Sequence, residues 1–451
     1  METFLQNLPK IELHAHLHGS LCITSIRELG LLLHGDKTPK FLELSKKLIE
    51  FDKTDNLKKC FHRFTFIHEL TASSKGLELA TELVIRDFAR DNVIYLELRS
   101  TPRSFADMSR RDYLKVLVET IESAQKAHNI VVKLLISIDR SQPTEIAEEI
   151  VTLAEEIKQK YPNIVKGLDL SGDPFQGTFQ SLQPLLKKAK DAHLNLALHC
   201  AEIDTAKETQ EMLDFGFQRC GHGTYLNEEQ LLQCVKQNIT IECCLTSNVK
   251  CATVKSYDSH HFPNILRNTQ CRVVLCSDDC GIFDSTLTQE FLKGHEFYQL
   301  SKDDIRRLSM NAIEASFADD QEKTSIKRTV VETLGWGRIA YDWCTSQEAK
   351  IARIHLAQDI FAVAKPNSYR SDMPKPIAQE HHERLRTTDI GSEENQETSR
   401  SYIKLCVRSL TYNAHFDASY ASDIHVEPIY WFVDNYAHEL GPLSFGRSSI
   451  I

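Results

Sequence analysis

The sequence predicts an α/β protein in which eight parallel strands close into a (β/α)8 barrel of the TIM-barrel type. Three observations support this prediction. Short apolar, β-rich runs recur from Lys10 to Asp279, helical patterns lie between them, and chemically reactive side chains stand at the C-terminal ends of the runs. In a barrel those ends form one shared rim, where such enzymes carry their chemistry. A doubly wound open sheet is the structural alternative, and it would leave the first and last strands at opposite edges.

Eight runs carry the strand pattern. They are Lys10–His16, Val93–Arg99, Val131–Asp139, Ile164–Gly172, Leu194–Glu202, Arg219–Gly223, Thr240–Ser247 and Cys271–Asp279. The segments between them have helical periodicity and a helix-forming composition, most clearly at residues 76–90, 110–127, 144–160 and 181–192. This alternation predicts βαβ units and a parallel sheet, and eight units are the number that closes a barrel.

Two regions fall outside this repeat. Residues Leu33 to Leu70 separate the first two strands by more than a usual connection, and their helical pattern predicts a cap over the barrel mouth. Helical patterns at 303–317 and 321–332 complete the last unit, so we expect the barrel domain to span residues 1–330. The remaining residues, 331–451, include a polar, charge-mixed run, and we expect an unassigned C-terminal extension that is partly disordered.

Charge and cysteine content argue against several classes of protein. The formal net charge of −10 and the pI near 6.0 do not suit a nucleic-acid-binding surface or an anionic membrane surface. The 13 cysteines are scattered and include no C-x-x-C pair, so neither a disulfide framework nor a structural zinc ribbon is indicated. No signal-peptide pattern and no run of 18 apolar residues occurs. We therefore expect a cytoplasmic (cytosolic) protein without membrane contact, and a monomer.

The stretch IELHAHLHGSL, Ile11 to Leu21, places three histidines at alternate positions. On a strand, residues two apart point to the same face, so His14, His16 and His18 would project together. Two histidines spaced in this way can offer two nitrogens to one metal ion. Alone, the pattern fits a polar strand edge equally well. The ends of the fifth and eighth strands add a histidine and an aspartate, and a closed barrel makes the eighth strand a neighbour of the first. We therefore expect one catalytic Zn²⁺ per subunit, with these ligands: His14, His16, His199 and Asp278.

Three further residues at the rim are candidates for moving protons. A zinc ion lowers the pKa of bound water from about 15.7 to roughly 7, so the site would supply hydroxide. Glu202 stands three residues after His199 and suits proton relay beside the metal. His222, in GHG, and Asp279, beside Asp278, are candidates to take a proton from that water and to orient it. Each pattern alone is more often a turn or a helix cap, and their joint placement favours the catalytic interpretation.

Five motifs, in order along the chain, resemble the adenosine deaminase family of metal-dependent hydrolases. They are IELHAHLHGSL, DLSGDP (Asp169–Pro174), LHCAE, RCGHGT and CSDDCGIF. The resemblance covers about Leu8 to Val330. Within the family, STPR (Ser100–Arg103), ISIDR and FTFIHEL (Phe64–Leu70) are most similar to the adenosine deaminase-like branch, the N6-methyl-AMP deaminases.

The resemblance implies zinc-dependent hydrolytic deamination of N6-substituted adenine mononucleotides at purine C6, which yields IMP and methylamine. By the same resemblance Glu202 would donate a proton to purine N1, and His222 and Asp279 would orient the hydroxide. Gly172 would offer its backbone to the purine. The positions that match the branch's contacts to the purine nucleoside monophosphate are His16, His18, His68, Ser100, Thr101, Pro102, Arg103, Asp139 and Asp279.

Position 18 favours a nucleotide over a free nucleoside. Family members that act on the nucleoside have an aspartate in the matching HLDG, and its charge would repel a 5′-phosphate. This chain has His18, where the deaminase-like branch usually has asparagine, and Arg103 can hold phosphate through a bidentate fork. Two alternatives stay open: an adenosine deaminase that acts on the free nucleoside, and a non-catalytic purine- or partner-binding protein.

Overall fold

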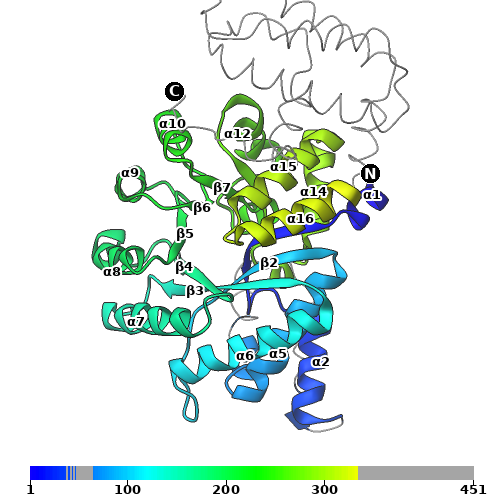
Figure 1. Cartoon of the computed structure of the whole chain (residues 1–451), viewed down its shortest axis with the longest axis vertical. Helices are drawn as coiled ribbons and strands as arrows, with labels where there is room; N and C mark the ends of the chain where they lie inside the picture. The colour runs from blue at the N-terminus through cyan, green and yellow to red at the C-terminus, as the bar shows by residue number, and fades with distance from the viewer. Residues whose placement is uncertain (37–38, 41–42, 44–45, 47–63, 65, 334–451) are drawn as a thin grey trace, which may run out of the picture. The chain divides into compact units, whose positions relative to one another are not determined.

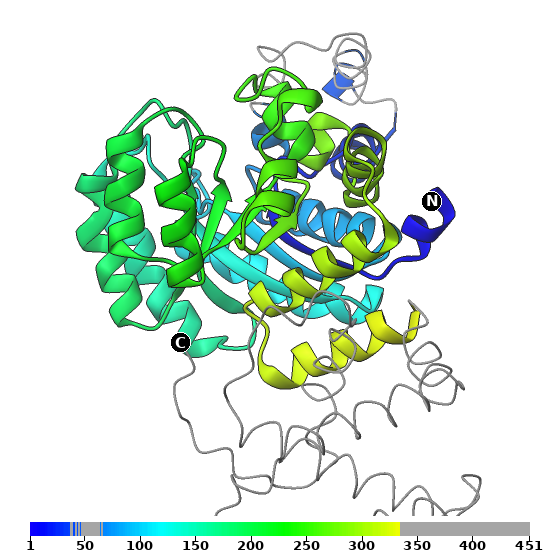
Figure 2. The same cartoon turned by 90° about the horizontal axis from the view of Figure 1, so that it is seen from above.

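The structure, a computed structural model, describes residues 1–36, 39, 40, 43, 46, 64 and 66–333. Its eight strands form a single parallel sheet in chain order, from β1 to β8. The strands are β1 (Lys10–His16), β2 (Val93–Ser100), β3 (Val131–Asp139), β4 (Val165–Ser171), β5 (Asn195–Cys200), β6 (Arg219–His222), β7 (Thr240–Cys243) and β8 (Val273–Leu275). They curve into a barrel with helices on its outside (Figures 1 and 2). The predicted (β/α)8 TIM barrel is confirmed.

Helices separate the strands along the described chain. They are α1 (Glu2–Asn7), α2 (Ile23–His34), α5 (Ser74–Arg90), α6 (Arg110–His128), α7 (Thr144–Lys160), α8 (Phe179–Asp191), α9 (Ala206–Phe215), α10 (Glu228–Gln237), α11 (Leu245–Lys250), α12 (Phe262–Asn268), α13 (Cys280–Phe283), α14 (Leu287–Tyr298), α15 (Lys302–Ala315) and α16 (Asp320–Thr333), with a 3-10 turn at Tyr257–Ser259. Capping boxes define several helix starts, for example at Ser109 before α6 and at Asn227 before α10. No described helix is long and apolar enough to span a bilayer.

The barrel closes between β8 and β1 through Asp278. Its backbone N–H donates to the carbonyl oxygen of His14 at 2.8 Å, and its carbonyl oxygen accepts from the N–H of His16 at 3.2 Å. Together these bonds form one parallel bridge between Ala15 and Asp278. The buried carboxylate of Glu12 reinforces the closure, because it accepts from the backbone N–H and the hydroxyl of Ser277, at 3.0 and 2.7 Å.

The seventh and eighth predicted strands differ most from the structure, because both are shorter than predicted. The run Thr240–Ser247 stops being a strand at Cys243, and Leu245 begins helix α11. The last run, Cys271–Asp279, is a strand only over Val273–Leu275. Both errors have one cause: the residues after these strands are as buried as the strands themselves, so the apolar run does not mark where the strand ends.

The predicted cap and extension are described only at their edges. Most of the segment from Leu33 to Leu70 lies outside the described residues, and those described at 39, 40, 43, 46, 64 and 66–70 are helical. Helix α16 continues to Thr333, three residues past the expected domain boundary at 330. The rest of the expected extension, 334–451, lies outside the described residues, so the domain division stays a prediction.

Candidate active site

Four predicted metal ligands converge at the C-terminal rim of the barrel. Nε2 of His199, on β5, lies 3.2 Å from Nε2 of His14 and 3.3 Å from Nε2 of His16, both on β1. Oδ1 of Asp278, just after β8, lies 3.5 Å from Nε2 of His14 and 3.4 Å from Nε2 of His16. All four donor atoms are within 4.8 Å of one another. The ends of the first, fifth and eighth strands thus meet as the closed barrel requires.

Hydrogen bonds to the far ring nitrogens fix how two of these histidines point. Nδ1 of His14 lies 2.9 Å from Oε2 of Glu242, and Nδ1 of His199 lies 3.0 Å from Oδ1 of Asp169. Burial opposes ionisation of Asp169, but His199 and Arg99 outweigh it and hold its pKa well below the usual value. An ionised carboxylate accepts only, so each Nδ1 donates its proton to the carboxylate, and each Nε2 is the atom that would face a bound metal ion.

This donor set fits a divalent metal ion such as zinc. Bonds of about 2.0–2.2 Å from one ion to nitrogen and oxygen require neighbouring ligand atoms to lie within about 4 Å of one another. The four separations given above, from 3.2 to 3.5 Å, meet this requirement. The residues therefore suit a divalent metal ion.

The backbone at the rim adopts conformations that non-glycine residues rarely take. Ala201, after β5, has φ +53°, His222, ending β6, has φ +66°, and Asp278, after β8, has φ +60°. Such left-handed residues cost of order 1 kcal/mol each and cluster at functional sites. Gly221 contributes space, because a Cβ there would lie 3.1 Å from Cε1 of His14.

The three predicted proton-handling residues surround the ligand cluster. Nε2 of His222 lies 3.8 Å from Oε1 of Glu202 and 3.9 Å from Oδ2 of Asp278. Burial lowers the pKa of His222 to about 4, so its ring is neutral at pH 7. Burial and the neighbouring Asp278 raise the pKa of Asp279 well above its usual value. Among the described residues, the buried Oδ1 of Asp279 has no hydrogen-bond partner, which leaves it for a ligand.

Two residues on α11 belong to this site and were not anticipated from the sequence. The hydroxyl of Ser247 donates to Oδ2 of Asp278 at 2.6 Å. The side-chain amide of Asn248 lies 3.2 Å from Nδ1 of His222 and 3.2 Å from the hydroxyl of Thr253. Ser247 was the last residue of the predicted seventh strand and Asn248 lay outside it, so the helix that carries both of them to the site was not anticipated.

The structure brings three of the predicted nucleotide contacts together. The His18 ring packs edge-on against His68, with centroids 4.9 Å apart, and its Nε2 lies 3.1 Å from the hydroxyl of Thr71. Burial lowers the pKa of His18 well below its usual value, and that of His68 to about 3, with Arg103 adding to both effects. Both rings are therefore neutral at pH 7.

Arg103 is a partly buried cation that lacks a carboxylate partner in the described part of the chain. Its Nε is buried and makes no hydrogen bond there. Burial lowers its pKa, and the more distant Tyr113 and Asp139 offset only part of that effect. A guanidinium held in this way is destabilised, so an anion bound beside it would be favoured.

The remaining predicted contacts occupy the adjoining strand ends. Ser100 ends β2 and shares a hydrogen bond of 2.7 Å with the hydroxyl of Tyr113, and Thr101 and Pro102 follow it. Oδ1 of Asp139 accepts from Ser141. Gly172, with φ +97°, lies against Asp139, since a Cβ there would be 2.2 Å from Oδ1.

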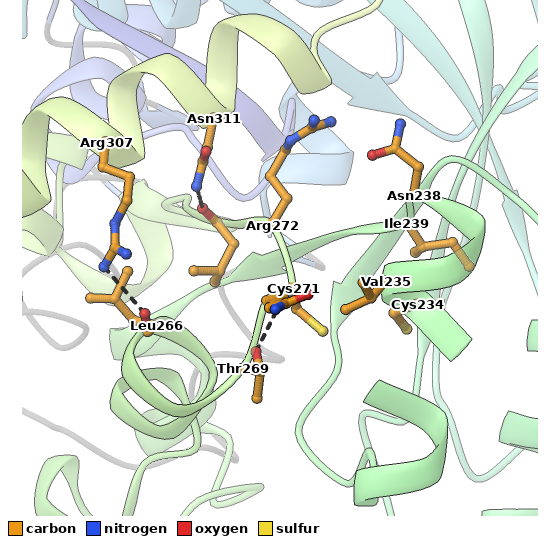
Figure 3. Close-up of a pocket in the computed structure, with 12 residues that line it drawn as sticks. Cys234, Val235, Asn238, Ile239, Leu266, Thr269, Cys271, Arg272, Arg307 and Asn311 are labelled. Carbon is orange, nitrogen blue, oxygen red and sulfur yellow. Dashed lines mark hydrogen bonds between the residues drawn. The ribbon is translucent and has the colours of Figure 1, made fainter. Parts of the chain in front are cut away.

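A cavity of about 260 Å³ is lined by other residues (Figure 3). It is lined by the end of α10, the start of β8 and helix α15, including Cys234, Arg272 and Arg307. Arg307 points to the carbonyl oxygen of Leu266, at 3.2 Å. None of the predicted site residues lines this cavity.

The sequence and the structure of this chain are similar to those of known proteins. The model of the adenosine deaminase family matches residues 9–333. The adenosine deaminase-like protein of Drosophila melanogaster is 48% identical over 324 residues, which cover 72% of this chain and 95% of that protein. The N6-methyl-AMP deaminase of Homo sapiens is 40% identical over 341 residues, covering 72% and 93%. The solved structure of Arabidopsis ADAL complexed with IMP is 36% identical, with a TM-score of 0.67, covering 74% of this chain and 99% of that one.

Proposed function

This chain belongs to the adenosine deaminase family, and we propose that it is a zinc-dependent N6-methyl-AMP deaminase. The reaction would be the hydrolysis of N6-substituted adenine mononucleotides at purine C6, which yields IMP and methylamine. Relatives that carry this name in Homo sapiens and Arabidopsis thaliana support the choice of substrate. A related protein that binds IMP supports a nucleotide ligand.

The observation that carries the proposal is the partly buried guanidinium of Arg103, which has no carboxylate partner among the described residues and lies near two neutral histidines. A 5′-phosphate would supply the anion that this cation lacks, and neutral His18 and His68 do not repel it. A free nucleoside brings no such charge. This feature therefore favours a nucleoside monophosphate over adenosine.

The site residues divide the chemistry among them. Zn²⁺, when bound by His14, His16, His199 and Asp278, would supply an activated water as nucleophile. Glu202, whose side chain is 17% exposed and lies 3.8 Å from Nε2 of His222, would protonate purine N1.

Three residues would position the reactants. The neutral His222 ring would orient the attacking water through Nε2, and the carboxyl of Asp279 would hold it from the other side. The backbone of Gly172 would contact the purine, because no side chain intervenes there. We place this activity in residues 1–330, with a cap at about 33–70, and propose no role for 331–451. A monomeric, cytosolic protein stays our expectation.

The decisive experiment compares four substrates on metal-replete protein: N6-methyl-AMP, AMP, N6-methyladenosine and adenosine. We expect the highest kcat/KM with N6-methyl-AMP. Preference for adenosine would favour the alternative of an adenosine deaminase. Tight purine binding without turnover of any of the four would favour a non-catalytic binding protein.

A variant pair isolates the phosphate contact. Arg103→Met should lower kcat/KM for N6-methyl-AMP by about 10- to 100-fold, the value of a charge-assisted hydrogen bond, and leave the slow nucleoside reaction unchanged. Arg110→Met is the matched control, because Arg110 already pairs with Glu149 at 2.8 Å. Equal losses on nucleotide and nucleoside would contradict the assignment of Arg103.

A further inference from the structure

Five charged side chains inside the barrel form one continuous chain of ion pairs. They are Glu97 and Arg99 on β2, Asp169 on β4, Arg219 on β6 and Glu242 on β7, each at most 1% exposed. Arg219 joins Glu97 at 2.5 Å and Glu242 at 2.6 Å. Arg99 joins Glu242 at 2.5 Å and Asp169 at 3.1 Å. Burying a charge is costly unless it is paired, so the fold must keep every ion pair of this network intact.

Arg99 touches the same two oxygen atoms that orient the ligand histidines. Oδ1 of Asp169 accepts from Arg99 NH1 and faces Nδ1 of His199 at 3.0 Å. Oε2 of Glu242 accepts from Arg99 NH2 and faces Nδ1 of His14 at 2.9 Å. One guanidinium fork therefore stands behind both carboxylates, and links a ligand on β1 to a ligand on β5.

The net charge of this ion-pair network suits a divalent cation at the rim. Three carboxylates face two guanidinium groups, which leaves one negative charge, and Asp278 adds a second at the ligand cluster. A doubly positive ion bound there would offset these two negative charges.

We propose that Arg99 is a positioning residue for the metal centre. Its fork holds Asp169 and Glu242 as fixed acceptors, so that His14 and His199 keep their protons on Nδ1 and present Nε2 to one cation. The inference rests on the metal site of the proposed function. Arg99 would contact neither the metal nor the substrate, yet it would determine the affinity of the site for the metal.

Metal affinity of the full-length chain tests this proposal without any activity measurement. In Arg99→Lys the charge stays, but one ammonium group cannot replace two fork contacts at fixed positions. We expect the apparent Kd for Zn²⁺, measured by competition with a chromophoric chelator, to rise by about 10- to 100-fold, as for other groups that orient metal ligands. Arg86→Lys is the matched control, because Arg86 holds Glu28 through an equivalent fork, at 2.8 and 2.9 Å, among surface helices. That control should bind Zn²⁺ like the wild type.

A second readout remains if Arg99→Lys does not fold. In ¹⁵N-labelled wild-type protein loaded with Zn²⁺, long-range ¹H–¹⁵N spectra report which ring nitrogen of each histidine is protonated and which binds the metal. We expect the Nδ1–H form for His14 and His199. Nε2–H forms, or a Kd for Arg99→Lys within twofold of the wild type, would overturn the role of Arg99. Wild-type protein that binds no Zn²⁺ would instead refute the proposed function itself.

Discussion

Replacing Gly19 by alanine would displace Asp279 while leaving its chemistry unaltered. A Cβ at position 19 would lie 1.6 Å from Oδ1, 2.2 Å from Cγ and 2.7 Å from Cβ of Asp279. Optimal contacts between non-bonded heavy atoms are about 3.5 Å, so the carboxyl group would have to move by roughly 2 Å. The glycine of the HGS sequence is therefore required for the position of an aspartate 260 residues later in the chain.

We expect Gly19→Ala to affect activity more than stability. Overpacking of this kind costs about 1–3 kcal/mol of unfolding free energy, measured by urea denaturation. Loss of a correctly placed proton-handling group lowers kcat by about 10²- to 10⁴-fold, measured with N6-methyl-AMP. KM should change little if phosphate contacts at Arg103 dominate binding.

A double-variant cycle separates this reasoning from a general disturbance. If Gly19→Ala acts through Asp279, then Gly19→Ala combined with Asp279→Ala should be no slower than Asp279→Ala alone. Asp279→Ala removes the two closest atoms and leaves only the 2.7 Å contact with Cβ. Multiplicative losses in kcat, or a Gly19→Ala variant with wild-type activity, would refute the argument.

Three further predictions concern stability and metal binding. Burial lowers the pKa of Lys10 to about 8, so the folded state binds this proton more weakly than the unfolded state, and the contribution of Lys10 to the unfolding free energy should rise between pH 8 and about 10.4. The difference in unfolding free energy between the wild type and Lys10→Met, measured with urea, should therefore shift toward the wild type by of order 3 kcal/mol over this range, and parallel pH curves for both proteins would contradict it. Ser247→Ala removes the 2.6 Å bond to Asp278 and should weaken Zn²⁺ binding about tenfold in chelator competition, whereas Ser247→Thr should restore it. Glu322→Gln leaves the buried ammonium of Lys133 without its charged partner and should lower the unfolding free energy, measured by chemical denaturation, by about 1–3 kcal/mol. An unchanged denaturation midpoint would show that this ion pair does not stabilise the packing of α16.

The fold was predictable because its signal repeats eight times. Each strand is an apolar run and each helix has a periodic face, so errors in single elements do not change the topology. The convergence of His14, His16, His199 and Asp278 was predictable because parallel strands end at one rim, whichever residues fill the core. The ends of the strands were less predictable, because buried helices and buried strands have similar apolar compositions. The predicted seventh strand, for example, extends into helix α11.

The polar residues beneath the ligands were missed for a different reason. Glu97, Arg99, Asp169, Arg219 and Glu242 interrupt apolar strands, and a charged residue in a strand is usually assigned to a solvent-facing position. A parallel strand in a barrel has no solvent-facing side, because helices cover one face and the barrel interior lies on the other. Charges inside such strands therefore indicate a buried network, and this signal was present in the sequence.

One residue, Asp278, both closes the barrel and belongs to the candidate metal ligands. The backbone of Asp278 makes the bridge between β8 and β1, and its carboxylate joins two histidines of β1 at the ligand cluster. Its left-handed backbone, with φ +60°, turns the side chain toward β1 while both backbone bonds are kept. A metal ion held there would tie the first strand to the last through side chains as well as backbone. The cost of that strained conformation would then be offset by the cation that the site binds.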